Sequence, residues 1–468
     1  MRWLRPLLPA ATLALPALAQ AAEIDGSRLS AWWGLPFAGL LLSIAILPLA
    51  APALWHRHFG KITAGWTLAF LLPYAAGHGI GAAGAALAHT VLSEYIPFIA
   101  LLVALFTAAG GIYVRGNLHG SPGTNVAIMA VASVLASVMG TTGASMLAIR
   151  PLLRANDNRR HQAHVVVFFI FTVSNVAGSL TPLGDPPLFL GFLKGVDFFW
   201  TPRHLFPETL FTLAVLLTLF YALDRYWYRR EGVLPRDPTP DSGRIGLDGA
   251  INLLPLAAVV GLVLMSGLWK PGITFELWGT SLALPQVLRD AALVLVTLAS
   301  LALTPAGVRA RNQFSWAPMQ EVAKLFVGIF VTMVPVLAML KAGEQGAFGA
   351  VAQAVTAADG QPLPWAYFWL SGLLSSFLDN APTYLVFFNL AGGDPVALMG
   401  PHAATLAAIS AGSVFMGANS YIGNAPNFMV KAIAESRGVR MPSFFGYLLW
   451  SGAILLPLFG VLTLVWFR

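Results

Sequence analysis

The chain has 468 residues, of which 57% are hydrophobic and 10% are charged, and its mean hydropathy is +0.72. Soluble domains carry about 25% charged residues, so the composition excludes an ordinary soluble protein and indicates a polytopic membrane protein. The sequence contains no Cys, which excludes disulfides, zinc–thiolate sites, iron–sulfur clusters and cysteine nucleophiles. The formal net charge is +7, and the positions of Lys and Arg decide whether it reports nucleic-acid binding or cytoplasmic loops.

The first 22 residues have the pattern of a secretory signal peptide. Arg2 and Arg5 precede an apolar run over 6–19, and small residues follow this run. An uncleaved first helix is the alternative. In both cases we expect residues 23–30 to face the periplasm of a bacterial-type cell, with the rest of the chain in the inner membrane.

Apolar runs predict ten membrane spans and two re-entrant hairpins. A helix needs about 20 apolar residues to cross ~30 Å of hydrocarbon. Two apolar stretches, 123–150 and 364–391, are interrupted at 140–143 and at 375–382, so each half is too short to cross and each stretch should turn back. The predicted spans lie near 34–54, 62–80, 95–114, 164–193 (interrupted), 204–224, 249–268, 290–305, 318–340, 402–430 (interrupted) and 443–466.

Lys and Arg are distributed unequally between the two sides of this topology. The segments predicted on the inner side hold 18 of the 27, namely 55–62, 115–122, 150–165, 225–249, 307–324 and 431–440. This bias follows the positive-inside rule and supports the topology. Because the charge is spread over short loops and forms no basic stripe with interleaved aromatic residues, the pattern excludes nucleic-acid binding.

The two halves of the chain repeat one order of elements: three spans, a hairpin, an interrupted span and a last span. We therefore expect two repeats, 34–226 and 249–468, joined by a cytoplasmic linker over 227–248. The topology places the ends of the two hairpins on opposite sides, so the repeats should be inverted. Inverted repeats with interrupted helices at matching places indicate a secondary transporter that binds its substrate near the membrane midplane.

Short sequence echoes support this match between the halves. A Gly-Asp/Asn-x-Pro-x-Phe pattern occurs at 184–189 and at 423–428. A small residue followed by Asn precedes each pattern, at 174–175 and 418–419. The spacing between the Asn and the pattern differs, which predicts that the two loops are not identical.

Oxygen-bearing side chains gather at the interruptions, where exposed backbone groups must line a cavity or hold a ligand. Such hard donors suit Na⁺ or a similar cation, although close helix packing is the alternative role for an individual Ser or Thr. The predicted ion- or substrate-binding residues are Asp379, Asn380, Ser376, Thr383, Asn175, Ser174, Asp185, Thr181, Asn419, Ser420, Asn424, Thr141 and Thr142. The Na⁺ candidates among them are Asp379, Asn380, Asn175 and Asn419.

Asp379 is the first candidate for the group that carries the exchanged ion. A charge at membrane depth costs roughly 3 kcal/mol or more, so it should bind a cation, accept a proton or pair with a base. No Lys or Arg occurs in the second hairpin to form such a pair. Asp185 ranks second, because an Asp before Pro186 is also a favoured helix cap.

The motifs of membrane-embedded enzymes and ATP-driven pumps do not occur in the sequence. It lacks H-E-x-x-H, G-x-x-x-x-G-K-[ST] and G-x-S-x-G. We therefore expect a transporter and no enzyme, with no cofactor beyond Na⁺ and H⁺ as transported ions.

The runs at 141–145, 174–187, 379–383 and 417–426 resemble the ion-transporter superfamily. The chain looks most similar to its sodium/proton antiporter branch, which is related to citrate and dicarboxylate carriers and to arsenite permeases. The resemblance covers nearly the whole chain after the signal segment. It implies a homodimer, a scaffold half and a transport half in each protomer that moves like an elevator, and a substrate site formed by hairpin tips and interrupted spans.

The chain departs from the patterns of both branches at its hairpin tips. Antiporters of this branch tend to carry acidic or Asp-Asn signatures at both tips, whereas the first tip here is Gly-Thr-Thr-Gly at 140–143. The hairpin tips of the dicarboxylate carriers tend to have a Ser-Asn-Thr pattern, which neither hairpin of this chain shows.

The sequence thus predicts an all-α polytopic membrane protein that exchanges Na⁺ for H⁺ across the bacterial inner membrane by alternating access. The first alternative is Na⁺- or H⁺-coupled transport of a small anion such as citrate, a dicarboxylate or arsenite. An uncoupled, channel-like permease is the alternative from another class. The expected partners are the lipid bilayer, small inorganic ions and a second copy of the chain, with no nucleic acid.

Overall fold

The computed structural model describes residues 25–233, 235, 238–239 and 245–468, so the predicted signal segment lies outside the described residues. The first half contains α1 (Leu35–Ala50), α2 (Pro52–His78), α3 (Ile80–Thr90), α4 (Ile96–Gly110), α5 (Pro122–Ala155), α6 (Ala163–Thr172), α7 (Pro186–Leu193) and α8 (Trp200–Glu231). A π-helical turn, Val91–Tyr95, joins α3 to α4.

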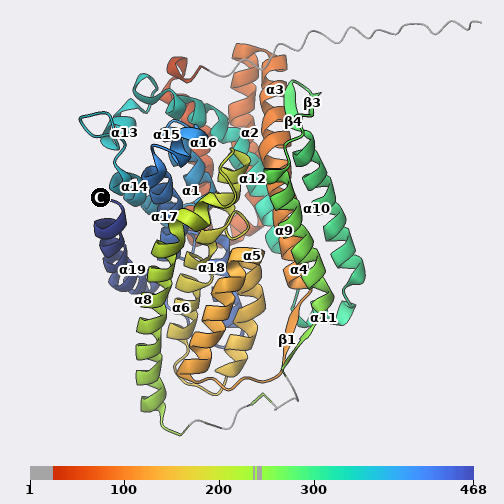
Figure 1. Cartoon of the computed structure of the whole chain (residues 1–468), viewed down its shortest axis with the longest axis vertical. Helices are drawn as coiled ribbons and strands as arrows, with labels where there is room; N and C mark the ends of the chain where they lie inside the picture. Colours follow the sequence, from red (N-terminus) through yellow and green to blue (C-terminus); the bar gives the residue numbers. More distant parts are fainter. Residues whose placement is uncertain (1–24, 234, 236–237, 240–244) are drawn as a thin grey trace, which may run out of the picture.

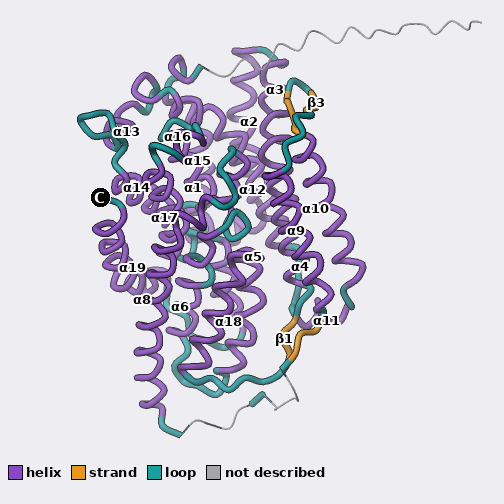
Figure 2. Tube along the Cα trace, viewed as in Figure 1, coloured by secondary structure: helices purple, strands orange, loops and turns teal. Residues whose placement is uncertain are grey.

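The second half repeats this order with extra short helices. It contains α9 (Leu253–Leu268), α10 (Leu284–Leu303), α11 (Ala306–Arg311), α12 (Ala317–Lys341), α13 (Gly349–Ala354), α14 (Pro364–Phe377), α15 (Asn380–Leu390), α16 (Pro395–Met399), α17 (Ala403–Phe415), α18 (Ala425–Ser436) and α19 (Phe444–Trp466). The strands form two small antiparallel ribbons, β1 (Tyr113–Arg115) with β2 (Gly246–Asp248), and β3 (Thr274–Leu277) with β4 (Thr280–Ala283). Helices make up most of the described chain (Figure 2), which confirms the all-α polytopic class.

Nine helices of the described chain are long and apolar enough to cross a membrane. One of them, α5, does not run straight. The backbone of Gly140 leaves the helical region, with φ 80° and ψ 152°. A straight helix of this length would separate its ends by about 50 Å, yet Gly120 donates a backbone hydrogen bond to Ala155. The chain therefore turns back on itself at Gly140, within the predicted tip of the first hairpin.

The second predicted hairpin is formed by α14 and α15. Leu378 and Asp379 separate the two helices. The rings of Tyr367 and Phe387, one on each helix, lie 6.3 Å apart, so the chain turns back on itself here as well. The two interrupted spans are α6 with α7 and α17 with α18, each pair joined by a 3₁₀ turn, Val176–Leu180 and Met416–Asn419.

The segments predicted on the inner side gather at one end of the bundle. β1 pairs with β2, Arg311 bonds Asp248, and Asn312 donates to the carbonyls of Gly110 and Ile112. Figure 1 shows β1, α11 and the lower end of α8 at this end, with α3, β3 and α13 at the opposite end. The uneven distribution of Lys and Arg thus separates the two ends of the fold.

The two hairpins open toward opposite ends. The ends of α5 lie beside β1, since Arg154 donates to Tyr113 and to the carbonyl of Val114. Residues that follow α15 lie at the other end, where Trp200 donates to the carbonyl of Met399 at 3.2 Å. This is the arrangement that the predicted inverted repeat requires.

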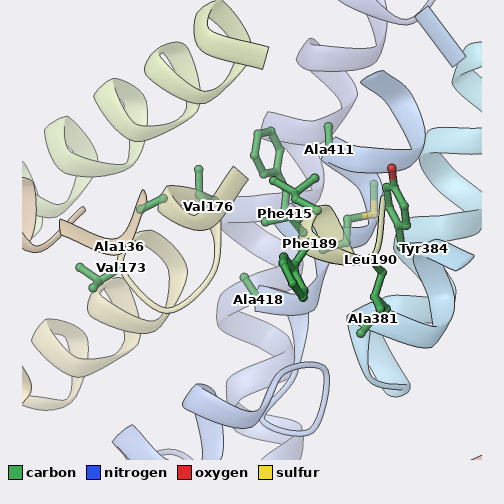
Figure 3. Close-up of a cluster of buried hydrophobic side chains, with 14 of the residues drawn as sticks. Ala136, Val173, Val176, Phe189, Leu190, Ala381, Tyr384, Ala411, Phe415 and Ala418 are labelled. Carbon is green, nitrogen blue, oxygen red and sulfur yellow. The ribbon is translucent and has the colours of Figure 1, made fainter. Parts of the chain in front are cut away.

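Apolar packing joins the hairpins to the interrupted spans. Figure 3 shows Phe189 and Leu190 of α7 between Phe415 of α17 and Tyr384 of α15. A Cβ on Gly191 would lie 2.3 Å from the hydroxyl of Tyr384, so only glycine allows α7 to approach α15 this closely. The core places both interruptions next to the hairpin tips.

At three boundaries the helix in the structure extends beyond the predicted segment. α2 begins at residue 52 where the apolar run begins at 62, α8 continues to 231, beyond the predicted repeat end at 226, and α10 begins at 284. Hydropathy detects the apolar part of a helix, whereas the backbone hydrogen bonds continue into its polar turns outside the hydrocarbon.

A buried ion-pair network holds the base of the first hairpin against α6 and α8. Arg159 Nη1 lies 2.6 Å from Asp224 Oδ1, and both side chains are fully buried. His164 Nε2 lies 2.8 Å from the same oxygen, and Asn125 Nδ2 donates to the other carboxylate oxygen at 2.9 Å. Because Asn125 begins the first arm of α5 and Arg159 follows the second, this network keeps the arms together.

The Asp224→Asn substitution should destabilise the fold, because it leaves the buried charge of Arg159 with one longer ion pair, to Glu231 at 3.4 Å. We expect the free energy of unfolding to fall by about 3 kcal/mol, measured by thermal unfolding of the purified protein in detergent. The control is Glu435→Gln, which removes a partly exposed pair with Lys431 and should change stability by less than about 1 kcal/mol. Equal losses of stability in the two variants would contradict a stabilising role of the Asp224 ion-pair network.

The Gly140→Ala substitution should weaken the first hairpin through its backbone. A non-glycine residue at the observed φ and ψ costs roughly 1–3 kcal/mol. The control is Gly452→Ala inside α19, where a Cβ meets nothing within 4 Å and alanine should stabilise the helix by up to about 1 kcal/mol. We expect the melting temperature to fall in Gly140→Ala and to rise in Gly452→Ala. A rise in Gly140→Ala would contradict the backbone conformation that requires glycine at the tip.

Candidate ion and substrate site

Four helix N-termini meet at the carboxylate of Asp185. Helix α7 begins directly after Asp185, and α18 begins after Asn424. The second arm of α5 begins after Gly140, and α15 begins at Asn380. Each N-terminus carries a partial positive charge of about one half, so the interruptions focus positive potential on one point.

The side chain of Asp185 is bonded from both halves of the protein. Thr141 Oγ1 donates to Oδ1 at 2.8 Å, and Asn424 Nδ2 lies 3.5 Å from the same oxygen. Asn380 Nδ2 donates to Oδ2. Asp185 is only 2% exposed, and its contacts come from both hairpin tips and from the other interrupted span.

The two acidic candidates both lie at helix starts, but their side chains make different contacts. Asp185 is the N-cap residue of α7 and its backbone carbonyl accepts from Leu188 and Phe189, whereas its side chain makes no capping hydrogen bond. Asp379 Oδ1 accepts from the backbone N–H of Ala381 at 3.0 Å and caps α15. Asp379 lies at the second tip and is half-buried, whereas Asp185 lies where the four N-termini meet.

Asparagine side chains link the two interrupted spans across the centre. Asn175 Nδ2 donates to Asn427 Oδ1 at 2.7 Å, and Asn424 Nδ2 lies 3.2 Å from Asn175 Oδ1. Asn424 Nδ2 also lies 3.2 Å from the carbonyl oxygen of Ser174. The two halves therefore share one polar centre.

The remaining predicted residues surround this centre at the second tip and in the loops. Ser376 Oγ accepts from Asn419 Nδ2 at 2.9 Å, and Ser420 donates to the carbonyl of Ser376. Thr383 Oγ1 donates to the carbonyl of Asp379 at 3.0 Å. Thr142 is half-buried beside the first tip. These contacts hold the tips and loops in place and do not reach Asp185 directly.

Corresponding hydrogen bonds recur in the two halves. Ser137 Oγ donates to the carbonyl of Ala177 at 3.0 Å, and Ser376 Oγ donates to the carbonyl of Met416 at 3.1 Å. In return, the hydroxyl of Thr181 donates to the carbonyl of Ser137, as Ser420 does to Ser376. Each interrupted span is thus tied to its own hairpin in the same way.

This correspondence aligns the two loops through their paired glycines. Gly184 and Gly423 pack on Gly178 and Gly417, because a Cβ would lie 2.3 Å and 2.6 Å from the respective carbonyl oxygens. The two Gly–Gly intervals are equal in length. The hydrogen bonds do not align Asn175 with the asparagine at 418–419. The two loops still differ, as the sequence predicted, because α6 ends at Thr172, well before Gly178, whereas α17 continues to Phe415, close to Gly417.

Two residues of the centre were not among the predicted binding residues. Ser137 lies three positions before the first tip, as Ser376 lies before the second, and this shared spacing could have identified it. Asn427 bonds the carbonyls of Gly417 and Ser420 at 2.8 and 2.9 Å. Its position within the repeated pattern at 423–428 was the available signal.

The donor set suits a small hard cation and an anion together. Asn380 Oδ1 and Asn419 Oδ1 are buried without a hydrogen-bond partner among the described residues. In that part of the chain no group of three His, Cys, Asp or Glu side chains could hold a metal ion. A cation here would therefore use amide, hydroxyl and carbonyl oxygens with the carboxylate of Asp185, while the N-termini favour anions.

A comparison with protein-family models identifies one match, over residues 26–467, to the family described as "Putative citrate transport". None of the curated proteins compared with the chain matches it. The family match spans both repeats, both hairpins and the whole polar centre. The chain is therefore a multi-pass membrane protein that belongs to this citrate-transport family.

Proposed function

We propose that the protein is a secondary transporter that couples the movement of a small carboxylate anion of the citrate type to a cation bound at Asp185. The observation that carries this proposal is the buried Asp185 carboxylate at the junction of four helix N-termini. The family match supports the substrate class. By the resemblance of its motifs, we also propose a homodimer in a bacterial inner membrane with elevator-like movement.

The need for coupling follows from the charges at the centre. The N-termini attract an incoming carboxylate, but the negative charge of Asp185 repels it at close range. A cation or a proton on Asp185 removes this repulsion. Binding of the cation before the anion is therefore favoured, and the same order links the two fluxes.

Exchange of Na⁺ for H⁺ without an anion is the second candidate function. Its supporting observation is that the hydrogen bonds to the Asp185 side chain within the described part of the chain come from Thr141, Asn380 and Asn424, none of which is basic. A carboxylate without a basic partner can hold Na⁺ and H⁺ in turn, and such competition is sufficient for antiport.

Proteoliposomes that contain an internal pH dye distinguish these functions. Uptake of labelled citrate that requires an inward Na⁺ or H⁺ gradient would support the proposal. Proton movement on addition of Na⁺ without any anion would instead support antiport. Citrate flux independent of both gradients would contradict coupling and indicate the uncoupled permease.

The matched pair Asp185→Asn and Asp379→Asn tests the position of the coupling group. Asp185→Asn keeps the shape and removes the charge at the junction, so coupled transport should fall at least about 100-fold, the loss expected for about 3 kcal/mol. Asp379→Asn preserves an oxygen that can cap α15 and should reduce transport less than about tenfold. Initial rates at equal protein density provide the measurement, and the reverse order would assign the coupling to Asp379.

The apparent affinity for the coupling cation should depend on pH if that cation and a proton compete for Asp185. As pH rises, fewer protons occupy the carboxylate, so the concentration of Na⁺ at half-maximal rate should fall, by up to about tenfold per pH unit where the carboxyl is mostly protonated. Rates measured over a series of pH values check this. An affinity for Na⁺ that is constant with pH would exclude a shared site.

A further inference from the structure

A mostly apolar cavity that contains one buried arginine lies apart from the Asp185 centre, near the end of the bundle that holds the base of the first hairpin. It has a volume of about 260 Å³. One wall comes from the second arm of α5 and from α18, with Met146, Arg150 and Ser436. The other wall comes from the segment before α12, with Gln313 and Ser315. We name this cavity the Arg150 crevice.

Arg150 gives the crevice its charge, since it is the ionisable residue in its lining. Arg150 is 6% exposed, and its Nε has no hydrogen-bond partner among the described residues. Its Nη1 has a long bond of 3.3 Å to the carbonyl of Met146. A buried guanidinium with an unused donor is costly unless a partner of opposite charge binds it.

A smaller neighbouring cavity adds positive charge. It has a volume of about 140 Å³ and is lined by Arg154 and Arg437 with one carboxylate, Asp157. The charge of Arg437 acts on Arg150, so the two cavities share one electrostatic environment. This environment favours anions over cations.

The crevice lies along helices that lead to the Asp185 centre. The second arm of α5 runs from Thr141 at the centre to Arg150, about 13 Å along a helix axis. Helix α18 begins beside Asn424 at the centre and lines the crevice with Met429 and Ser436. Phe106, Met146 and Met319 form an apolar cluster against Met429. Phe106, Met146 and Met429 of this cluster line the crevice beside Arg150.

We propose that the Arg150 crevice is a second anion-binding site, at which a small carboxylate binds to the Arg150 guanidinium on its way to or from the Asp185 centre. Gln313, Ser315 and Ser436 supply neutral hydrogen-bonding groups for the rest of the anion. The assignment to the transported carboxylate rests on the proposed function, whereas the anion site itself rests on the crevice alone.

Cysteine labelling tests the site directly, because the sequence contains no Cys. In a Ser436→Cys variant, a negatively charged methanethiosulfonate should react about tenfold faster than a positively charged one, owing to Arg150. Citrate or inorganic phosphate should protect the thiol. Adding Arg150→Gln should remove both effects, and Arg150→Lys should retain part of them. The control is Ser281→Cys, which is exposed on β4 and should show no protection.

Transport measurements then test the route. The Arg150→Gln variant should raise KM for citrate about tenfold, the loss of one charge-assisted hydrogen bond, with kcat little changed. Arg57→Gln, an exposed charge on α2, is the control. Equal labelling rates without protection would overturn the site, and an unchanged KM would overturn its place on the route.

The experiments give a different result if the proposed function is wrong and the anion site is right. If the wild-type protein carries no citrate or dicarboxylate while phosphate still protects Ser436→Cys through Arg150, the crevice remains an anion site and the proposed substrate class is wrong.

Discussion

The burial of one carboxylate, that of Asp185, is the constraint on which the remaining architecture depends. An anion held away from water is costly unless dipoles or opposite charges surround it. Here four helix N-termini and the donors Thr141, Asn380 and Asn424 surround it. Four N-termini can meet at membrane depth only if helices start there, and this requires two hairpins and two interrupted spans.

Interrupted helices bring a second cost, because their loops leave backbone groups without helical partners. The structure satisfies some of these groups with hydroxyl hydrogen bonds between each hairpin and its interrupted span, such as Ser137 with Ala177 and Ser376 with Met416. Asn175 and Asn427 then join the two halves. The polar centre is therefore tied to the hairpin within each half and is linked across the two halves by amides.

The Asp224 ion-pair network and the Arg150 crevice lie at the same end of the bundle and have different roles. The network fixes the base of α5 to α6 and α8 through paired buried charges. In the crevice, Arg150 keeps an unused donor on the other side of α5. One hairpin thus combines a fixed base, a buried guanidinium with an unused donor and a tip that bonds the central carboxylate.

The sequence by itself determined the all-α polytopic class, the places at which helices break and the end at which positive charge gathers, because these follow from apolar length, helix-breaking residues and the charge bias. It also identified most residues of the polar centre, without Ser137 and Asn427. It did not determine which carboxylate lies at the junction: Asp185 and Asp379 both precede helices, and Asp before Pro suggested a cap. Only the tertiary structure decided this, since the direction of a side chain at a helix start depends on what packs against it. The alignment of the two loops was decided in the same way, by hydrogen bonds between segments far apart in the sequence.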